Sequence, residues 1–299
     1  MSTNTAQAHT LARLNTAAER LWPTLHAAWE AHAPNALGGE GLHPVPTGLS
    51  IEVLASIDSS NTELMRRARA GHTDPVLLVA VDQTAGRGRM GKAWVSQPGH
   101  SLTFSLGLPL RPTHWAGLSL AVGVSLAESL ATLLPANQRP QLTLKWPNDL
   151  WLNGAKLAGI LVETAHVGTH PFVVVGVGIN VVPPEPAALA PGGVTPTGLA
   201  AHTHTLDTAD VWQAVAPALL NDLLAFESLG FSAFAQRFVQ RDALHGQVLT
   251  LSDGTSGTGC GVDDDGALLV LTAQGMRTVS SNEVSVRPQP PATRGAEPC

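Results

Sequence analysis

Residues 145–163 read KWPNDLWLNGAKLAGILVE and carry a strong local signal of fold. Segments 150–152 and 156–164 are largely apolar and flank Asn153-Gly154, the dipeptide typical of a two-residue β-hairpin turn. Before the hairpin, Trp146-Pro147 favours an extended backbone that leads into a turn. The stretch therefore predicts two antiparallel strands joined by a tight turn.

Strands and helices are predicted on both sides of this hairpin. Apolar and β-branched runs predict strands over 51–57, 76–81, 101–108, 142–146 and 172–177. Apolar residues at helical spacing predict helices over 61–70, 211–228 and 231–240. After Gly246 the chain turns to short β segments with turns at 252–254 and 263–266. The predicted class is α+β, with a mixed, largely antiparallel sheet followed by a small β domain.

Residues 115–134 are apolar enough to be mistaken for a membrane span. However, Glu128 and several serines interrupt the stretch, and Leu118, Val122 and Leu126 recur at helical spacing. We predict a buried core helix and no membrane association.

Composition divides the chain into four parts. Residues 1–47 form an Ala-rich helical extension, 48–244 the main domain, 245–288 the small β domain, and 289–299 a tail predicted to be disordered. The extension is short for a helix-turn-helix unit and is not basic, so we favour a packing helix over a DNA-binding module.

The overall charge and cysteine content exclude some classes of function. A formal net charge of −6 and a pI near 6.0 argue against a general nucleic-acid binder. Two cysteines, Cys260 and Cys299, are too few for a disulfide framework, and the N-terminus lacks the pattern of a signal peptide. We therefore predict a cytoplasmic protein.

Lysine is rare in this chain. Only Lys92, Lys145 and Lys156 occur, against fourteen arginines, so Arg is the usual surface cation of this chain. Lys offers a compact ammonium that can follow charge developing on phosphate or carboxylate oxygens. All three lysines lie between residues 92 and 156, close to Gly-rich and Trp-Pro-Asn-Asp segments. This clustering favours a functional role over a chance grouping of surface lysines.

Residues 86–91 read GRGRMG and match the G-x-G-x-x-G pattern of dinucleotide-binding loops. The context contradicts that interpretation, because Pro98 and Gly99 oppose the helix that should follow, and no acidic residue lies about 20 positions on. Glycines instead let the backbone approach a ligand, and Arg87, Arg89 and Lys92 can neutralise an anion. The alternative is a flexible basic surface loop.

The hairpin region carries a second group of polar residues. Asn148 and Asp149 lie at a predicted strand end, where polar groups face a pocket mouth, and Lys156 follows the turn. Gly159 removes a side chain where a flat ligand can lie against the backbone. Asp149 alone could simply hold the turn, but together with Lys145 and Lys156 it favours a phosphate-plus-magnesium site.

Four segments together resemble one family. Residues 58–61 (DSSN), 83–94 (QTAGRGRMGKAW), 145–163 and 176–180 (GVGIN) have the order and spacing of biotin–protein ligases, most closely the bacterial enzymes that biotinylate acetyl-CoA carboxylase. The resemblance runs from about residue 50 to 287. It implies a catalytic domain like that of class II aminoacyl-tRNA synthetases, followed by an SH3-like β-barrel.

The resemblance implies a ligase that acts in two steps. Biotin and ATP, with Mg²⁺, would form biotinyl-5′-AMP and pyrophosphate, and a lysine of a biotin carboxyl carrier protein of acetyl-CoA carboxylase would then accept the biotin. It also allows a homodimer formed by sheet extension, and it implies no DNA binding, since the N-terminal segment does not resemble a winged helix.

The resemblance assigns roles to residues of all four segments and to the end of the β domain. The catalytic group would be Lys156, Arg89 and Asp149, with Asp149 as the magnesium ligand. The biotin site would comprise Ser59, Ser60, Asn61, Gln83, Gly86, Arg87, Arg89, Lys156 and Gly159. The ATP site would comprise Arg87, Arg89, Lys92, Trp94, Lys145, Asn148, Lys156, Ile179, Asn180 and Arg287.

The chain departs from the family pattern at three positions. The loop usually reads GRGRRGR-x-W, but here Met90 and Lys92 replace two arginines, and the loss of two cationic forks would weaken loop ordering or adenylate retention. Ser60 stands where Thr is common and preserves the hydroxyl.

Three other functions stay open at this point. A lipoate- or octanoate-protein ligase shares the fold and the acyl-adenylate chemistry, although KWPND, KLAGIL and the GRGR loop favour biotin. A biotin-sensing transcriptional regulator is disfavoured by the N-terminus. A catalytically weak biotin-binding protein is suggested only by Met90 and Lys92.

Overall fold

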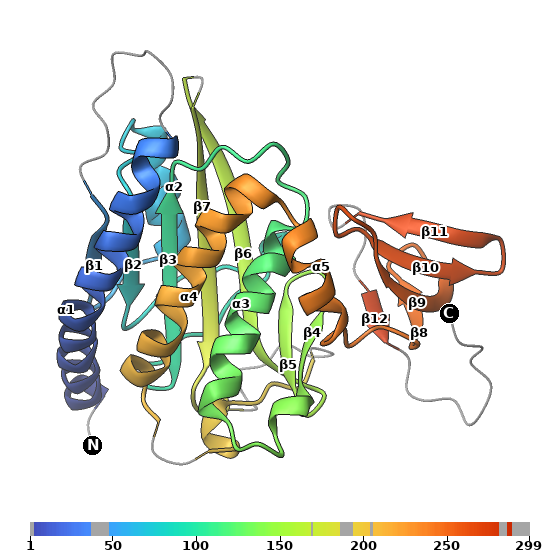
Figure 1. The fold of residues 1–299 in the computed structure, drawn as a ribbon. Coiled ribbons are helices and arrows are strands. Elements are labelled where there is room, and N and C mark those ends of the chain that lie inside the picture. Colours follow the sequence, from blue (N-terminus) through green and yellow to red (C-terminus); the bar gives the residue numbers. More distant parts are fainter. Residues whose placement is uncertain are drawn as a thin grey trace.

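The computed structural model describes residues 3–36, 48–168, 170–185, 194–203, 206–280 and 286–288. Its main element is a seven-stranded sheet in the order β1-β2-β3-β7-β6-β5-β4 (Figure 1). The strands are β1 (Ser50–Leu54), β2 (Val76–Ala80), β3 (Ser101–Leu108), β4 (Leu142–Lys145), β5 (Asp149–Leu152), β6 (Ala155–Val167) and β7 (His170–Asn180). β1 and β2 are parallel, and the other neighbours are antiparallel. The predicted α+β class with a largely antiparallel sheet is confirmed.

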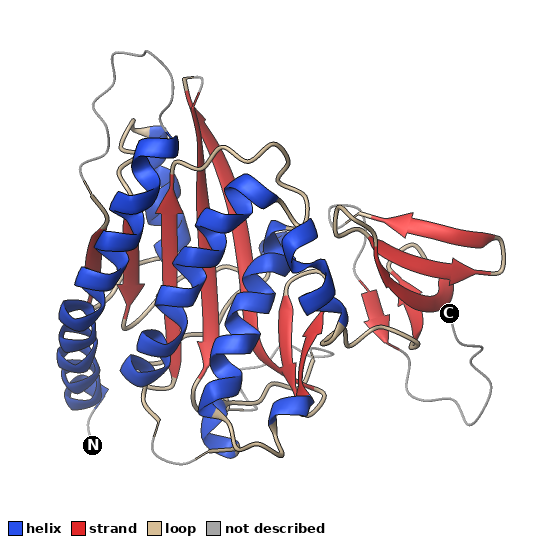
Figure 2. Ribbon diagram, viewed as in Figure 1, coloured by secondary structure: helices blue, strands red, loops and turns tan. Residues whose placement is uncertain are grey.

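Helices cover the two faces of this sheet unequally (Figure 2). The helices are α1 (Thr3–Ala36), α2 (Ser60–Arg69), α3 (Leu118–Leu133), α4 (Thr208–Leu229) and α5 (Ser232–Val239), with short 3₁₀ helices η1 (Arg89–Gly91), η2 (Arg139–Gln141) and η4 (Leu199–Ala201). α1, α3, α4 and α5 contribute to the large core on one face. α2 packs on the opposite face over a smaller core.

The two faces of the central strands differ because side chains alternate along a strand. In β3, Phe104 and Leu106 enter the large core, whereas the alternate positions Thr103 and Ser105 point to the α2 face. β7 repeats this pattern, with valines on the large core and glycines on the α2 face. Next to the start of α2, this face is therefore lined by small and polar residues of β3 and β7.

The apolar stretch 115–134 forms helix α3 in the core. Leu118, Val122 and Leu126 are buried there, as predicted. Across the described residues, no helix is both long and apolar enough to cross a membrane.

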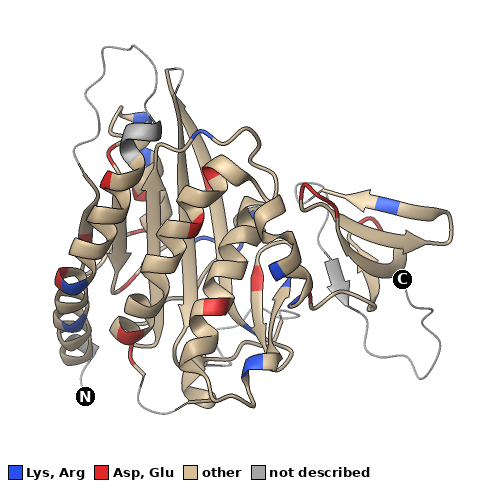
Figure 3. Ribbon diagram, viewed as in Figure 1, with Lys and Arg blue, Asp and Glu red and all other residues tan. Residues whose placement is uncertain are grey.

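Within the N-terminal segment, residues 3–36 form a single long helix, α1, that packs along α4 and β1. Leu14, Leu21, Leu25 and Trp29 are buried in the large core, as their helical spacing predicts. α4 itself is acidic and carries no Lys or Arg, as the colouring of Figure 3 shows. α4 therefore contributes no basic side chain of the kind that contacts DNA phosphates.

The small β domain is a five-stranded antiparallel sheet in the order β11-β10-β9-β8-β12. Its strands are β8 (Val248–Leu251), β9 (Ser256–Val262), β10 (Leu268–Thr272), β11 (Gly275–Val279) and β12 (Val286–Pro288). The Trp146 indole Nε1 donates a buried hydrogen bond to the Gly266 carbonyl at 3.0 Å. This bond connects the small sheet to the strand end that leads into Asp149.

We expect Trp146→Phe to lower the free energy of unfolding by about 1–3 kcal/mol, because the buried Gly266 carbonyl loses its donor. The matched control is Trp212→Phe, since the Trp212 Nε1 is buried with no hydrogen-bond partner among the described residues. Both changes remove the same volume from a fully buried site. Urea denaturation should show the larger loss for Trp146→Phe, and equal losses would mean that volume alone matters.

Candidate active site

A cleft opens on the α2 face of the sheet, over β3, β7 and β6. Backbone pairing aligns Thr103 with Gly178 and Gly159, and the next row begins with Ser105 and Gly176. Apart from Leu161 at the end of the second row, the floor is therefore made of small residues, which lets a ligand lie close to the backbone. The empty volume of the cleft, counted out to its open mouth and including the solvent there, is about 1020 Å³.

The Gly-rich loop forms its own small hairpin at this cleft. The Gly88 amide donates to the Lys92 carbonyl at 2.7 Å, and the Trp94 amide donates to the Gly86 carbonyl at 2.9 Å. At its turn, Met90 has a φ of 54°, and its side chain is 77% exposed. The loop does not open an α-helix, so its local fold agrees with our rejection of a dinucleotide-binding motif.

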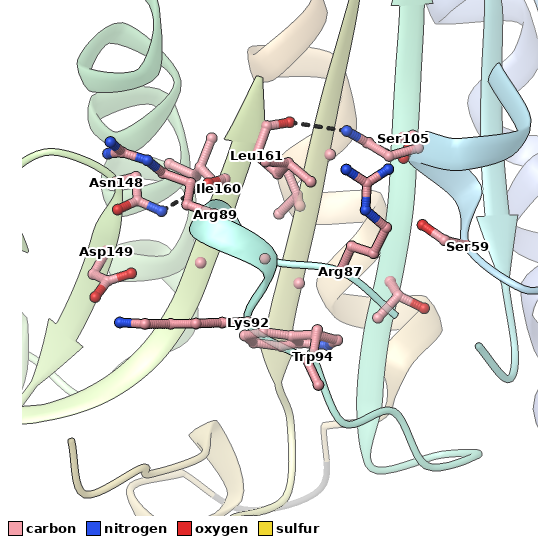
Figure 4. A pocket seen from close by; sticks show the side chains of 18 of the residues that line it. Ser59, Arg87, Arg89, Lys92, Trp94, Ser105, Asn148, Asp149, Ile160 and Leu161 are labelled. Atoms are coloured by element: carbon pink, nitrogen blue, oxygen red, sulfur yellow. Dashed lines mark hydrogen bonds between the residues drawn. The ribbon is translucent and has the colours of Figure 1, made fainter. Parts of the chain in front are cut away.

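The hairpin sends one arginine toward each end of the cleft (Figure 4). Arg87 donates to Thr62 Oγ1 on α2 at 3.3 Å and pairs with Glu163 at 3.2 Å. Arg89 points the other way, toward Asp149. Burial lowers the pKa of the Arg89 guanidinium, and the Asp149 charge opposes this shift. The loop therefore places a cation beside both parts of the cleft.

Trp94 lies on the glycine floor. A Cβ atom at Gly178 would collide with the Trp94 indole, and one at Gly159 would lie 3.4 Å from Trp94 Cζ3. Gly159 and Gly178 are also direct partners in the β6–β7 pair. The indole thus rests over paired glycines, and at Gly178 this contact requires a residue without a side chain.

The three lysines of the chain all line this cleft. Lys156 Nζ forms a salt bridge to Asp149 Oδ1 at 2.7 Å. Lys145 is only 9% exposed, and its Nζ lies 5.6 Å from the centroid of the Trp151 ring. Burial lowers the pKa of Lys145; Asp149 opposes this shift, and the other cations of the cleft add to it. The Lys145 ammonium is therefore poorly hydrated and lies among other cations. Such a site favours an anionic ligand.

At the other end, a chain of hydrogen bonds runs from Gln83 to Glu163. The Ser60 amide donates to Gln83 Oε1 at 2.7 Å, and Ser60 Oγ lies 2.7 Å from Ser105 Oγ. Ser105 Oγ donates to Asn61 Oδ1 at 2.6 Å, and Asn61 Nδ2 donates to Glu163 Oε2 at 3.0 Å. Ser60 and Asn61 stand at the start of α2, so the helix N-terminus supports a recognition surface of fixed polar groups.

Most residues predicted for the site lie along the cleft. They are Ser59, Ser60, Asn61, Gln83, Arg87, Arg89, Lys92, Trp94, Lys145, Asn148, Asp149, Lys156 and Gly159. Two of these are held by local bonds: Ser59 caps α2 through Thr62, and Asn148 Nδ2 donates to the Ile160 carbonyl at 2.8 Å.

Four predicted residues do not line the cleft as described. Gly86 lies at the base of the loop hairpin, and Ile179 is fully buried on the opposite face of the sheet. Asn180 is buried, with its Nδ2 at 3.5 Å from the Lys156 carbonyl. Arg287 belongs to β12, and its side chain lies outside the described residues.

Sequence reasoning missed several residues that complete the site. Ser105 and Glu163 belong to the polar chain, and Gly176 and Gly178 form the floor. The alternating glycines of GVGIN carry a signal for this floor, because one side of a strand without side chains implies close approach. Nothing in the local sequence around Ser105 distinguishes it from other serines in apolar strands.

Residues suited to holding a metal are few. Among the described residues, no group of three or more His, Cys, Asp or Glu side chains is arranged to bind a metal ion. Asp149 is the one carboxylate lining the described cleft. A single carboxylate fits Mg²⁺, which commonly binds through one or two carboxylates together with substrate phosphates.

Comparisons with known proteins agree with this geometry. Residues 53–180 match the biotin/lipoate A/B protein ligase family, and residues 247–287 match the biotin protein ligase C-terminal domain. A biotin--[acetyl-CoA-carboxylase] ligase of Paracoccus denitrificans is 33% identical over 242 residues, which cover 78% of this chain and 98% of that protein. The chain belongs to the biotin protein ligase family.

Solved structures of biotin protein ligases support the same assignment. The biotin protein ligase of Aquifex aeolicus in complex with biotin and ATP has a TM-score of 0.64 at 28% identity, covering 81% of this chain and 99% of that chain. A mutant of the same Aquifex aeolicus protein in complex with biotin has a TM-score of 0.66 at 27% identity, covering 80% and 99%. The fold class predicted from the motifs is thus shared with this family.

Replacing Lys145 by Met should raise the free energy of unfolding by about 1–2 kcal/mol, because it removes a buried charge. A lowered pKa means that the charge destabilises the folded state at neutral pH, and this penalty fades as pH rises toward the ordinary value of 10.5. The gain over wild type should therefore be larger at pH 7 than at pH 10.

The stabilities of the Lys145→Met and wild-type proteins are compared by thermal unfolding at pH 7 and pH 10, with Lys156→Met as the control. Lys156 is more exposed and already paired with Asp149, so its removal should bring no comparable gain. A Lys145→Met protein that is no more stable than Lys156→Met would contradict a cost of burying Lys145.

Proposed function

We propose that this protein is an ATP-dependent biotin–protein ligase. The observation that supports it best is that one cleft with a glycine floor has two different ends. At the cationic end, Lys145, Lys156 and Arg89 surround Asp149, and at the other end polar groups lie at the start of α2. One reactant would be a neutral polar ring with a carboxylate side chain, and the other a nucleoside triphosphate. A reaction between them needs the polar end and the cationic end in one site.

The first step joins two anions. A biotin carboxylate oxygen attacks the α-phosphorus of ATP, the bond to the pyrophosphate oxygen breaks, and biotinyl-5′-AMP forms. In the second step, a carrier lysine amine attacks the acyl carbon, AMP leaves, and the amine loses a proton. Cations that neutralise both reactants without reacting supply most of the stabilisation such a step needs.

We assign the catalytic roles to Lys156, Arg89 and Asp149. The Lys156 ammonium extends from β6 into the cleft, where it can contact the biotin carboxylate and the α-phosphate together. Arg89 approaches from the loop side, and closure of the loop would exclude water from the mixed anhydride. Asp149 holds Lys156 in the unliganded state and is the candidate ligand for Mg²⁺, which would neutralise phosphate charge when bound.

The biotin end of the site would lie at the start of α2. Its residues are Ser59, Ser60, Asn61, Gln83, Gly86, Arg87, Arg89, Lys156 and Gly159. Hydroxyl and amide groups there can pair with a ureido ring, and the small floor at Gly159 leaves room for a flat bicyclic ligand.

The ATP end would lie beside the cationic cluster and β7. Its residues are Arg87, Arg89, Lys92, Trp94, Lys145, Asn148, Lys156, Ile179, Asn180 and Arg287. The Trp94 ring covers the Gly159–Gly178 pair, and an adenine ring would either stack on this indole or displace it from the glycines.

Partners and location follow from the same proposal. The acceptor would be the biotin carboxyl carrier protein of acetyl-CoA carboxylase, and a homodimer is compatible with the open sheet. We expect no role in DNA binding, because α1 is engaged in packing. We place the protein in the cytoplasm on the basis of the proposed activity.

The proposed substrate class is tested by pyrophosphate release from ATP-Mg without carrier protein, using biotin, lipoate and octanoate in parallel. Release with biotin alone is expected. Release with lipoate or octanoate would assign the protein to the sister ligases. No release with any of the three would favour a binding or sensing role.

Lys156→Ala should lower the rate of pyrophosphate release by about 10²–10³-fold, because the transition state loses a cation between two anions. Thermal unfolding should show an intact fold. Normal adenylate formation in this variant would remove Lys156 from its assigned role without affecting the substrate assignment.

A further inference from the structure

Glu163 stands behind the cleft, at the end of the polar chain. It lies on β6 and does not line the described cleft, yet both of its carboxylate oxygens are engaged. Oε1 accepts from Arg87 Nη2 at 3.2 Å, and Oε2 accepts from Asn61 Nδ2 at 3.0 Å. One carboxylate therefore contacts both the Gly-rich loop and the start of α2.

An ionised carboxylate can only accept hydrogen bonds, and this fixes the orientation of Asn61. One Asn61 Nδ2 proton goes to Glu163, and the other goes to the Leu161 carbonyl at 3.2 Å. The Asn61 Oδ1 atom must then face Ser105, whose hydroxyl donates to it at 2.6 Å. Ser105 thus has no proton left for any other partner.

The direction passes on to the residues that face the ligand. Because the Ser105 proton is committed, Ser60 must donate across the 2.7 Å contact between the two hydroxyls. Gln83 Oε1 then accepts from the Ser60 amide at 2.7 Å rather than from the more distant Ser60 hydroxyl at 3.2 Å. Gln83 Nε2 is left as a donor, without a partner in the described part of the chain, and Ser60 Oγ is left with acceptor capacity.

The surroundings leave little freedom for another arrangement. Ser105 is fully buried, and Ser60 and Asn61 are each 3% exposed, so water does not readily replace a lost partner. A Cβ atom at Gly176 would collide with the Asn61 amide, so the floor holds Asn61 closely in place. The Asn61–Ser105–Ser60 part of the chain is therefore held closely in place.

We infer that Glu163 is a positioning residue that sets the hydrogen-bond direction of the Asn61–Ser105–Ser60–Gln83 chain, and that this direction selects a ligand ring with a carbonyl acceptor flanked by N–H donors. The inference rests on the proposed function and deepens it, because a ureido ring has this pattern. A guanidino ring, which offers only donors when protonated, has the wrong pattern at the carbonyl position.

The decisive measurement compares biotin with 2-iminobiotin, in which a guanidino group replaces the ureido group, by kcat/KM for pyrophosphate release. Glu163→Gln keeps the shape of the side chain but adds a donor, so that only the Leu161 carbonyl still favours the observed Asn61 orientation and reversal costs less. We expect the biotin KM to rise about tenfold, the ATP KM to change less than about twofold, and the preference for biotin over 2-iminobiotin to fall about tenfold.

Two further variants separate direction from charge and from folding. Ser105→Ala interrupts the chain without changing any charge and should reduce the preference similarly. Thr62→Val removes the hydroxyl that Arg87 contacts at 3.3 Å but leaves the Glu163–Asn61 bond, so the preference should stay as in wild type whatever happens to the rate.

An unchanged preference in folded Glu163→Gln, with wild-type protein active on biotin, would overturn the inference while leaving the proposed function intact. An equal fall in Thr62→Val would also overturn it, because a general disturbance of the loop contact would then be the cause. Inactivity of wild-type protein toward biotin would instead refute the proposed function itself.

Discussion

The site depends on one constraint: the central sheet must present almost no side chains over Gly159, Gly176 and Gly178. Antiparallel pairing brings these three glycines together, since Gly159 faces Gly178 across β6 and β7, with Gly176 two residues away. The space above them is occupied by Asn61 and by Trp94. A methyl group at Gly176 would displace Asn61, and one at Gly178 would displace Trp94. The recognition chain and the loop hairpin therefore both rely on this floor.

The opposite face of the same strands explains how such a floor remains stable. Val175, Val177 and Ile179 alternate with the glycines and are buried under the helical layer of α1, α3 and α4. Burial on one face supplies the hydrophobic stabilisation that glycine positions cannot contribute. The long α1 helix adds to this layer, since Leu14, Leu21, Leu25 and Trp29 extend the core over α4 and β1. The structure thus separates packing from chemistry across the thickness of one sheet.

The sequence predicted local structure well and spatial partners poorly. The strand 101–108 was predicted with its observed bounds, because an apolar run between turn residues is a local signal. β7 was predicted too short, since its glycines weaken strand propensity although pairing with β3 and β6 holds them in the ladder. Glu163 and Arg87 are 76 positions apart, and Ser105 meets Asn61 across 44, so no local pattern could reveal these contacts.

The loop departures have a physical interpretation once the hairpin is known. Met90 lies at the turn, where its side chain is mostly exposed, whereas Arg87 and Arg89 on the two sides of Gly88 reach into the cleft. An arginine at position 90 would add charge at the rim rather than beside Asp149. Lys92 retains a cation among the residues that line the cleft. The cleft therefore keeps a cation at position 92, and the charge that is lost relative to the family pattern is the one at the exposed turn, position 90.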